Sequence, residues 1–307
     1  MDIQTSDIST IKPFFNKLYI PPSDSHKGHN GKVLIIGGSR LFHSASLWAA
    51  EVATHFADMV HYASTKENNE IFHTLKTTFR NGIIVEQKDI PYYIKEDDAI
   101  LLGPGMVRDE DKNYELRITN YQSLLAIQNE AEFSRAMVYL VAKQFAHKRF
   151  VIDAGALQMM DAEWLPLFKE TPIITPHQLE FERLFGVSVV DMPIDQKADI
   201  VKEYAAKYNC VILLKAVVDI ISDGEQIAVV QGGNQGLTKG GSGDILAGVT
   251  AAFRSKNEAF VSAVVASYTE KSAADDLKKT KGYWYNMNDL LDQIPITFTQ
   301  ILRACKD

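Results

Sequence analysis

A glycine-rich stretch that runs into an aspartate is the part of this sequence best suited to chemistry. Residues 237–248 read LTKGGSGDILAG, with Gly240, Gly241 and Gly243 around one serine. Each glycine loses much backbone entropy on folding, so three glycines in four positions indicate a backbone need for them. That need is a turn with positive φ, which we expect at Gly243, or close approach of the backbone to a ligand. The apolar stripe that follows predicts a helix from Asp244. Free N–H groups at such a helix start favour an anion, although a tight loop capped by Asp244 fits the same residues.

Five short apolar runs predict the strands that position this turn. They are rich in Val, Ile and Leu without alternation, which is typical of strands buried in a parallel sheet. They cover residues 32–39, 99–105, 149–155, 171–177 and 210–216. Helix-compatible segments at 45–57, 181–186 and 195–208 alternate with them and predict an α/β layered fold. A hairpin is expected at 219–231, and helices at 244–255, 257–279 and 288–304.

The carboxyl ends of these strands carry the other residues that could do chemistry. They are Gly37-Gly38, Gly103-Pro104-Gly105, Asp153, His177 and Lys215. Ligands gather at this edge of a parallel sheet, so we predict one shared active site. An aspartate there can accept a proton from a hydroxyl that attacks a phosphoryl group, while helix N–H groups stabilise the transferred charge. The chain contains neither the dinucleotide-binding motif G-x-G-x-x-G after its first strand nor the P-loop motif G-x-x-x-x-G-K-[ST]. The site therefore fits a small-molecule phosphotransferase that has no P-loop.

Composition narrows the class of protein further. The 307 residues are 46% apolar and 23% charged, with a formal net charge of −7. No strongly basic field is available, which argues against nucleic acid or an anionic membrane as the partner. Two distant cysteines, Cys210 and Cys305, give neither a disulfide framework nor a metal motif, so we expect a reducing, cytoplasmic compartment. We find no signal-type N-terminus and no apolar stretch that approaches a membrane span.

Motifs in order from about His26 to Leu302 resemble the nucleotide-dependent NAD(P)H-hydrate dehydratases, a carbohydrate-kinase-like family of the ribokinase-like superfamily. They read HKGHNGKVLIIGGS, ILLGPGM, VIDAGAL, ITPHQLEFERLFG, VILLKAVVDII, NQGLTKGGSGDILAGVTAAF and ASYTEKSAADDL…MNDLLDQIP. GG[ST]GD preceded by N-x-G-L is the most specific match. The resemblance implies a three-layer fold, with a mostly parallel central sheet flanked by helices and a small hairpin near 219–231. It implies a single domain at 26–307, an N-terminal extension at 1–25 and a charged helical insertion at about 107–148.

The resemblance also implies an activity and a set of site residues. In the family, a nucleotide phosphorylates the hydroxyl of the hydrated nicotinamide ring, and loss of phosphate restores NADH or NADPH. Asp244 would be the catalytic base and contact the hydrate, and Mg²⁺ would accompany the nucleotide phosphates without a dedicated ligand cluster. The nucleotide would contact Lys215, Ala216, Val217, Val218, Asp219, Asn234, Gly236, Thr238, Gly240, Gly241, Ser242 and Gly243. The hydrated dinucleotide would contact Ala45, Gly103, Gly105, Asp153, His177, Glu180 and Asp244.

The chain departs from the family pattern at several positions. Ala216, Leu179 and Gly155 stand where glycine, glycine and aspartate are usual, Glu270 stands where a histidine is usual, and the loop RLFHSAS is bulkier. These departures concern the hydrate contacts more than the phosphate chemistry. Two alternatives stay open: a kinase of the same fold acting on a hydroxymethylpyrimidine or thiazole alcohol, and a non-catalytic nucleotide-binding sensor. We expect ADP rather than ATP as donor, a homo-oligomer that is a tetramer by family resemblance, and no epimerase domain within residues 1–25.

Overall fold

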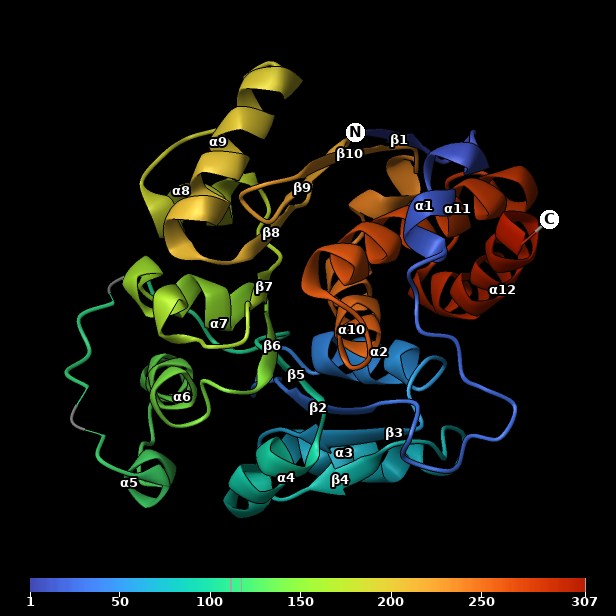
Figure 1. The fold of residues 1–307 in the computed structure, drawn as a ribbon. Helices are drawn as coiled ribbons and strands as arrows, with labels where there is room; N and C mark the ends of the chain where they lie inside the picture. The colour runs from blue at the N-terminus through green and yellow to red at the C-terminus, as the bar shows by residue number, and fades with distance from the viewer. Residues whose placement is uncertain (111, 117, 307) are drawn as a thin grey trace.

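The computed structural model describes residues 1–110, 112–116 and 118–306. Within them, ten strands form one sheet in the order β1-β10-β9-β8-β7-β6-β5-β2-β3-β4 (Figure 1), and all neighbours are parallel except where β9 pairs with β8 and β10. The strands are β1 Asp2–Gln4, β2 Lys32–Ile36, β3 Met59–Ala63, β4 Ile83–Val85, β5 Ala99–Leu102, β6 Arg149–Ile152, β7 Ile173–Ile174, β8 Val211–Leu214, β9 Asp219–Ser222 and β10 Ile227–Gln231.

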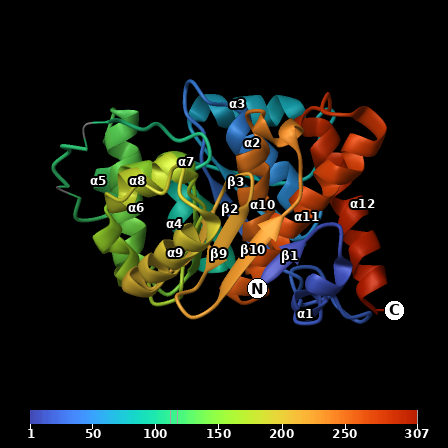
Figure 2. The ribbon, with the colours of Figure 1, turned by 90° about the horizontal axis from the view of Figure 1, so that it is seen from above.

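Helices cover both faces of this sheet (Figure 2). One face carries α1 Lys12–Phe15, α2 Ser44–Ala53, α3 Lys66–Leu75, α10 Ser242–Arg254, α11 Ala259–Lys281 and α12 Met287–Lys306. The other carries α4 Ile90–Glu96, α5 Tyr121–Leu125, α6 Glu130–Gln144, α7 Ala154–Met159, α8 Gln178–Phe185 and α9 Ile194–Tyr208. Successive strand residues alternate between the two cores: Val33 and Ile35 pack with α2 and α10, whereas Leu34 and Ile36 pack with α4 and α6. The predicted three-layer α/β fold is confirmed.

The five expected strands and the hairpin form as predicted, but three strands were missed. β3 and β4 lie in a stretch to which we assigned no strand, and β1 pairs in parallel with β10 at the sheet edge. In β3, MVHYA, the apolar run is broken by His61, which is buried. Its burial is compensated by a polar partner, because its Nδ1 lies 2.8 Å from a carboxylate oxygen of buried Asp97. That compensation comes from a residue 36 positions away, so the strand pattern alone conceals it.

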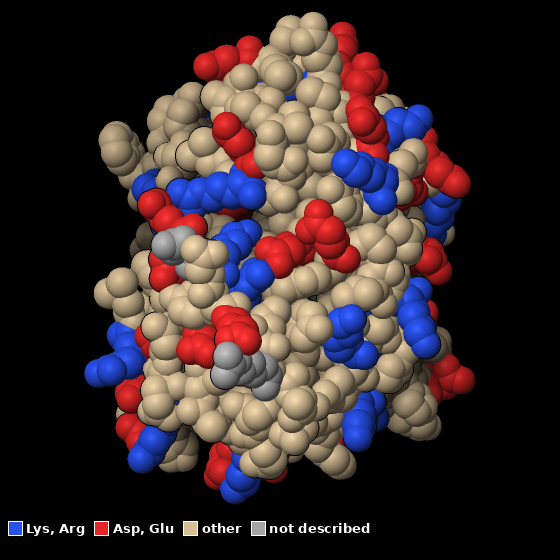
Figure 3. Space-filling view, turned by 90° about the vertical axis from the view of Figure 1, so that its left-hand side faces the viewer, with Lys and Arg blue, Asp and Glu red and all other residues tan. Residues whose placement is uncertain are grey.

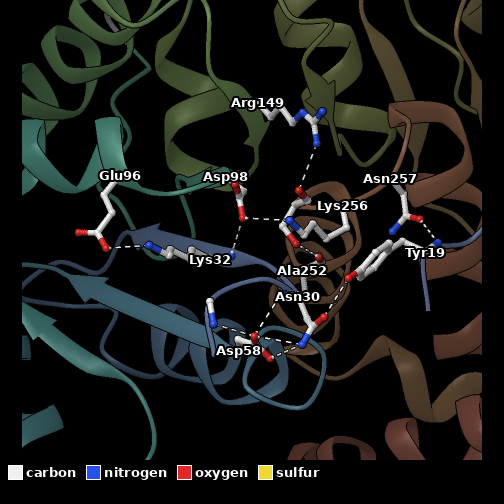
Figure 4. Close-up of polar contacts among 12 residues, drawn as sticks. Tyr19, Asn30, Lys32, Asp58, Glu96, Asp98, Arg149, Ala252, Lys256 and Asn257 are labelled. Atoms are coloured by element: carbon white, nitrogen blue, oxygen red, sulfur yellow. Dashed lines mark hydrogen bonds and ion pairs between the residues drawn. The ribbon is translucent and has the colours of Figure 1, made fainter. Parts of the chain in front are cut away.

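The segment between α1 and β2 is hydrogen-bonded to the edge of the sheet where the parallel strands begin (Figure 4). The polar residues expected to form the site follow the strands at the opposite edge. The Asn30 amide donates to both Asp58 oxygens at 3.1 Å, and the Tyr19 hydroxyl donates to Asn30 Oδ1 at 2.9 Å. The first β2 amide, of Lys32, donates to Asp98, which comes just before β5. These bonds hold the loops that enter β2, β3 and β5.

The segment 107–148 contains α5 and α6 after an irregular stretch, of which positions 111 and 117 lie outside the described residues. α6 is largely buried: nine of its 15 residues, among them Met137 and Val141, are buried, and only Lys143 and Gln144 at its end are exposed. Figure 3 shows acidic and basic side chains interspersed on the face that carries α5 and α6, without a patch of one sign.

Among the described residues, no helix combines the length and apolar character needed to cross a membrane.

Candidate active site

The glycine turn opens α10, but its strained residue is not the one we expected. Gly241 is the N-cap of α10 with φ +108°, and a Cβ there would overlap the Trp48 ring. Gly243 lies in the first helical turn without positive φ, so our expectation for Gly243 was wrong. A Cβ on Gly243 would instead lie 3.4 Å from Lys215 Nζ. That is an ordinary van der Waals distance, so the turn requires a glycine at 241 and not at 243.

Asp244 is the third residue of α10 and not its cap. It lies in the first turn, where backbone N–H groups have no partner within the helix and the dipole favours negative charge. The turn and this carboxylate line a cavity of about 400 Å³, which we call the α10 cavity. Its other walls come from the carboxyl ends of β5, β6, β7 and β8, through Gly105, Asp153, His177 and Lys215.

An ion pair crosses the floor of the α10 cavity. Lys215 Nζ lies 2.7 Å from Asp153 Oδ1, and the Thr175 hydroxyl donates to the same oxygen at 2.7 Å. Asp153 is almost fully buried. Burial by itself would lower the pKa of Lys215, but the nearby carboxylates of Asp153 and Glu180 outweigh it and raise that pKa. The lysine is therefore a fixed positive charge at neutral pH.

His177 caps the helix that follows β7. Its Nδ1 accepts the Glu180 N–H at 3.2 Å, and Glu180 Oε2 accepts the His177 N–H at 2.9 Å, which forms a capping box. Burial lowers the pKa of His177, and Lys215 adds to this effect. A neutral ring that accepts at Nδ1 carries its proton on Nε2. His177 can therefore donate a hydrogen bond from Nε2 to a ligand.

The electrostatic surroundings of Asp244 suit a general base. Burial, followed by the like charges of Asp153 and Glu180, raises its pKa to about 7, although Lys215 acts in the opposite direction. A base whose pKa lies near the working pH combines the ionised form with a useful affinity for the proton. Perturbed acids of this kind in a cavity are typical of catalytic sites.

A second cavity, of about 460 Å³, adjoins the first at Lys215 and is called here the β8–β9 cavity. One wall is the β8–β9 loop, with Ala216 and Val217, and the other is the segment 232–238, with Asn234 and Thr238. The Asn234 side chain accepts the Gly236 N–H at 3.0 Å, and a Cβ on Gly236 would overlap the Tyr285 ring. The N-x-G sequence therefore shapes this wall.

Most of the residues selected from the sequence line one of these two cavities. The α10 cavity receives Ala45, Gly105, Asp153, His177, Glu180, Lys215, Gly240, Gly241, Ser242, Gly243 and Asp244; the β8–β9 cavity receives Lys215, Ala216, Val217, Asn234 and Thr238. Gly103, Val218, Asp219 and Gly236 do not line either cavity. Gly103, with φ +126°, lets β5 pass against the Asp153 carbonyl, and Asp219 accepts the Ala216 N–H.

Sequence reasoning missed several lining residues. They are Phe42, Met106, Arg108, Ala154, Gly155, Gln158 and Lys239 in the α10 cavity, and Gly232, Gly233, Gln235, Leu237, Lys271, Lys278 and Tyr283 in the β8–β9 cavity. Met106 and Arg108 follow the GPG segment directly, so their proximity to that motif was a signal. Lys271 and Lys278 lie within α11, where no local pattern separates them from other helix lysines.

The structure shows the surroundings of each departure from the family pattern. A Cβ on Gly155 would overlap the Met106 carbonyl, and the adjoining Ala154 has φ +45°. Ala216 has no positive φ, so glycine is not needed there. Leu179 is 57% exposed on α8. Glu270 is buried, its Oε1 has no partner among the described residues, and burial raises its pKa to about 8.

Among the described residues, no group of three or more His, Cys, Asp or Glu side chains is arranged to hold a metal ion. Two of the three carboxylates that line the α10 cavity are already engaged: Asp153 holds Lys215, and Glu180 holds Gln158 and the His177 N–H, whereas Asp244 is the third. Such a donor set suits Mg²⁺, which keeps much of its water and is carried by substrate phosphates.

This fold is ribokinase-like: the solved structure of a ribokinase-like superfamily protein of Enterococcus faecalis shares it, with a TM-score of 0.75 and 21% identity over 98% of this chain and 96% of that one. The model of the NAD(P)H-hydrate dehydratase family matches residues 33–296, and the chain belongs to that family.

Named relatives agree with this assignment, and a solved structure shares the fold. The chain is 33% identical over 281 residues to a bifunctional NAD(P)H-hydrate repair enzyme of Methanocaldococcus jannaschii, covering 89% of this chain and 49% of that protein. It is 31% identical to an ADP-dependent (S)-NAD(P)H-hydrate dehydratase of Nitrosopumilus maritimus, covering 93% and 95%. The chain thus spans about half the length of the bifunctional relatives it matches. The Bacillus subtilis ADP/ATP-dependent NAD(P)H-hydrate dehydratase, co-crystallised with ATP/Mg²⁺, shares the fold, with a TM-score of 0.74 and 20% identity over 97% of this chain and 99% of that one.

Two neighbouring glycines provide a matched test of the turn. Gly241→Ala places a side chain at φ +108° and against Trp48, so the free energy of unfolding in urea should fall by about 1–3 kcal/mol or more. A Cβ on Gly240 would meet no described atom within 4 Å, so Gly240→Ala should change the free energy of unfolding by less than about 0.5 kcal/mol. Equal effects of the two substitutions would contradict this account of the turn.

Proposed function

We propose that this protein is an ADP-dependent (S)-NAD(P)H-hydrate dehydratase, a hydro-lyase that restores NADH or NADPH from their hydrated forms. The observation that carries the proposal is Asp244, an acid with a pKa of about 7 at the N-terminus of α10, beside Lys215 and the glycine turn. The family assignment and the dehydratase relatives support the same activity.

The first step transfers a phosphoryl group to the ring hydroxyl. The Asp244 carboxylate takes the hydroxyl proton as the oxygen forms its bond to phosphorus and the bond to the departing nucleotide oxygen breaks. The first-turn N–H groups of α10 stabilise the charge that spreads over the transferred group. Lys215, fixed by Asp153, adds a positive charge, and His177 donates from Nε2 to orient the hydrate. ADP is converted to AMP.

The second step expels the new phosphate. The ring nitrogen lone pair forms a double bond to the carbon that carries the phosphate, the carbon–oxygen bond breaks, and the neighbouring carbon loses a proton. Inorganic phosphate and the dihydronicotinamide result. Phosphate is a good leaving group, so the site needs mainly to keep the hydrate in place.

The two cavities divide the substrates between them. The hydrated ring and the transferred phosphate occupy the α10 cavity, and the remainder of the adenine nucleotide occupies the β8–β9 cavity, with Lys215 at their junction. When bound with the nucleotide, Mg²⁺ would neutralise charge on the phosphates, and Glu180 and Asp244, which line the same cavity, would contact it through water.

Residues 26–307 act in this proposal as one domain, onto which the extension 1–25 packs, because β1 joins the same sheet and α1 lies in its core. We infer a homo-oligomer, a tetramer by resemblance to the family. Leu41 and Trp284, which are 73% and 87% exposed, are candidate residues for such a contact. Sedimentation equilibrium should give a mass well above that of one chain, and a monomer at all concentrations would contradict the inference.

Reaction stoichiometry tests the activity. With hydrated NADH, Mg²⁺ and ADP, the absorbance of reduced nicotinamide, inorganic phosphate and AMP should rise one to one to one; a parallel reaction with ATP identifies the preferred donor. Asp244→Asn should slow turnover by about 10²–10⁴-fold and leave nucleotide affinity nearly unchanged. A lasting phosphoester without free phosphate would instead establish a kinase, and nucleotide binding without turnover a sensor.

The pH profile tests Asp244 as the base. Only the carboxylate accepts the proton, so kcat/KM should be low in acid and rise to a plateau through pH of about 7, the pKa of Asp244 in the free protein. Glu180→Gln removes a like charge and should move this rise to lower pH. Glu203→Gln, on the exposed side of α9, should leave it unchanged. A rise near pH of about 4, the ordinary value for an aspartate, would exclude this role.

A further inference from the structure

One helix, α11, contributes polar side chains to the β8–β9 cavity and to the loops around it. Ser267, Lys271, Asp275 and Lys278 follow one another along α11 at spacings of four, four and three residues, so they lie on one side of it. Lys271 and Lys278 line the cavity directly. Figure 2 shows α11 beside β10, next to the strands whose loops enclose the cavity. Ser267, Lys271 and Asp275 lie within the motif ASYTEKSAADDL, but neither the resemblance nor the proposed reaction gives them a role.

Lys271 bonds to the β8–β9 loop from below. Its Nζ donates to the carbonyl oxygens of Val217 at 3.0 Å and Ala216 at 3.3 Å, and lies 3.4 Å from Asp219 Oδ1. The Lys271 side chain is only 4% exposed, although it borders the cavity, so its ammonium is committed to these three oxygens. A buried lysine needs such partners to stay charged.

Asp219 closes this arrangement at the far end of the loop. Its Oδ1 accepts the Ala216 N–H at 2.9 Å, and its Oδ2 accepts the Ser267 hydroxyl at 2.7 Å. Two residues of α11, one turn apart, thus hold Asp219 and the loop together. Val217 is 89% exposed, so its side chain adds little packing that could fix the loop.

These bonds fix the direction of two peptide groups. The N–H of a trans peptide points opposite to its C=O, and the described chain contains no cis peptide bond. With the carbonyls of Ala216 and Val217 bound to Lys271, the N–H groups of Val217 and Val218 point away from α11. The loop therefore presents backbone donors in a fixed orientation.

The same helix also braces the opposite wall of the cavity. Asp275 Oδ2 accepts the Gly233 N–H at 3.0 Å, and the Ala274 carbonyl accepts from the Asn234 amide at 2.8 Å. Both walls of the cavity are therefore hydrogen-bonded to α11, and this one helix sets the distance between them.

We propose that Lys271 is a positioning residue for nucleotide binding: with Asp219 and Ser267 it holds the β8–β9 loop in the conformation that receives the nucleotide. This inference rests on the proposed function for the identity of the ligand, an adenine nucleotide. Lys271 acts through the loop and takes no part in proton or phosphoryl transfer.

Calorimetric titration with ADP, in the presence of Mg²⁺, tests the proposal without the hydrate. Lys271→Met keeps the length of the side chain and removes its charge, and should weaken ADP binding by about tenfold or more, as expected for lost charge-assisted hydrogen bonds. Lys271→Arg should recover part of the affinity. Lys279→Met is the matched control on the same helix: Lys279 is 73% exposed and pairs with Asp276, so the affinity should stay within about twofold of wild type.

Two further readouts separate positioning from a general loss of structure. In Lys271→Met, KM for the nucleotide should rise while KM for the hydrate, at saturating nucleotide, changes little. Amide exchange should accelerate at Ala216 and not across α10. If Lys271→Met fails to fold, Ser267→Ala carries the test, with an expected loss of ADP affinity of about threefold from one weakened contact.

The outcomes distinguish the two proposals. Unchanged ADP affinity in Lys271→Met, or in Ser267→Ala where that variant carries the test, overturns the role of Lys271 and leaves the dehydratase proposal standing. Wild-type protein that binds ADP but releases neither NADH nor phosphate overturns the dehydratase proposal alone. Wild-type protein that binds neither ADP nor ATP overturns both.

Discussion

The ion pair between Lys215 and Asp153 is the interaction on which the candidate site depends. It joins the carboxyl ends of β8 and β6 across β7, whose Thr175 donates to the same Asp153 oxygen. The pair is nearly buried, so its charges act through a medium less polar than water and with little screening. Lys215 remains positive because of Asp153, and the Asp153 carboxylate contributes to the raised pKa of Asp244. Removing either partner would leave an uncompensated charge beside the cavity.

The loops that carry Asp153 and its neighbours approach one another closely through their backbones. Gly103 and Gly155 lie where a Cβ would overlap the carbonyls of Asp153 and Met106, so the loops after β5 and β6 fit together only without side chains. Ala154, between Asp153 and Gly155, takes φ +45°, a conformation that ordinary residues adopt at a cost. Strain of this kind persists where the surrounding structure holds it, and here it accompanies a buried aspartate at the site.

The helices α10 and α11 divide the work of the site between them. α10 presents Asp244 and its unpaired amides to the phosphate, whereas α11 supports the two loops around the β8–β9 cavity. Both helices pack on the same face of the sheet and on each other (Figure 1). The geometry between phosphate and nucleotide therefore depends on helix packing, which is rigid because apolar interiors are close-packed.

The sequence by itself determined the strands that end at Asp153, His177 and Lys215, and the glycine turn before Asp244. These signals are local: apolar runs of strand length, and glycines next to a helical stripe. The tertiary structure decided what depends on distant partners. Positive φ fell at Gly241 because α10 begins there, and Lys271 reached the loop because α11 packs behind β8–β10. No local sequence pattern predicts the position of the positive φ or the contact of Lys271, because contacts between residues far apart in the chain depend on how the layers pack.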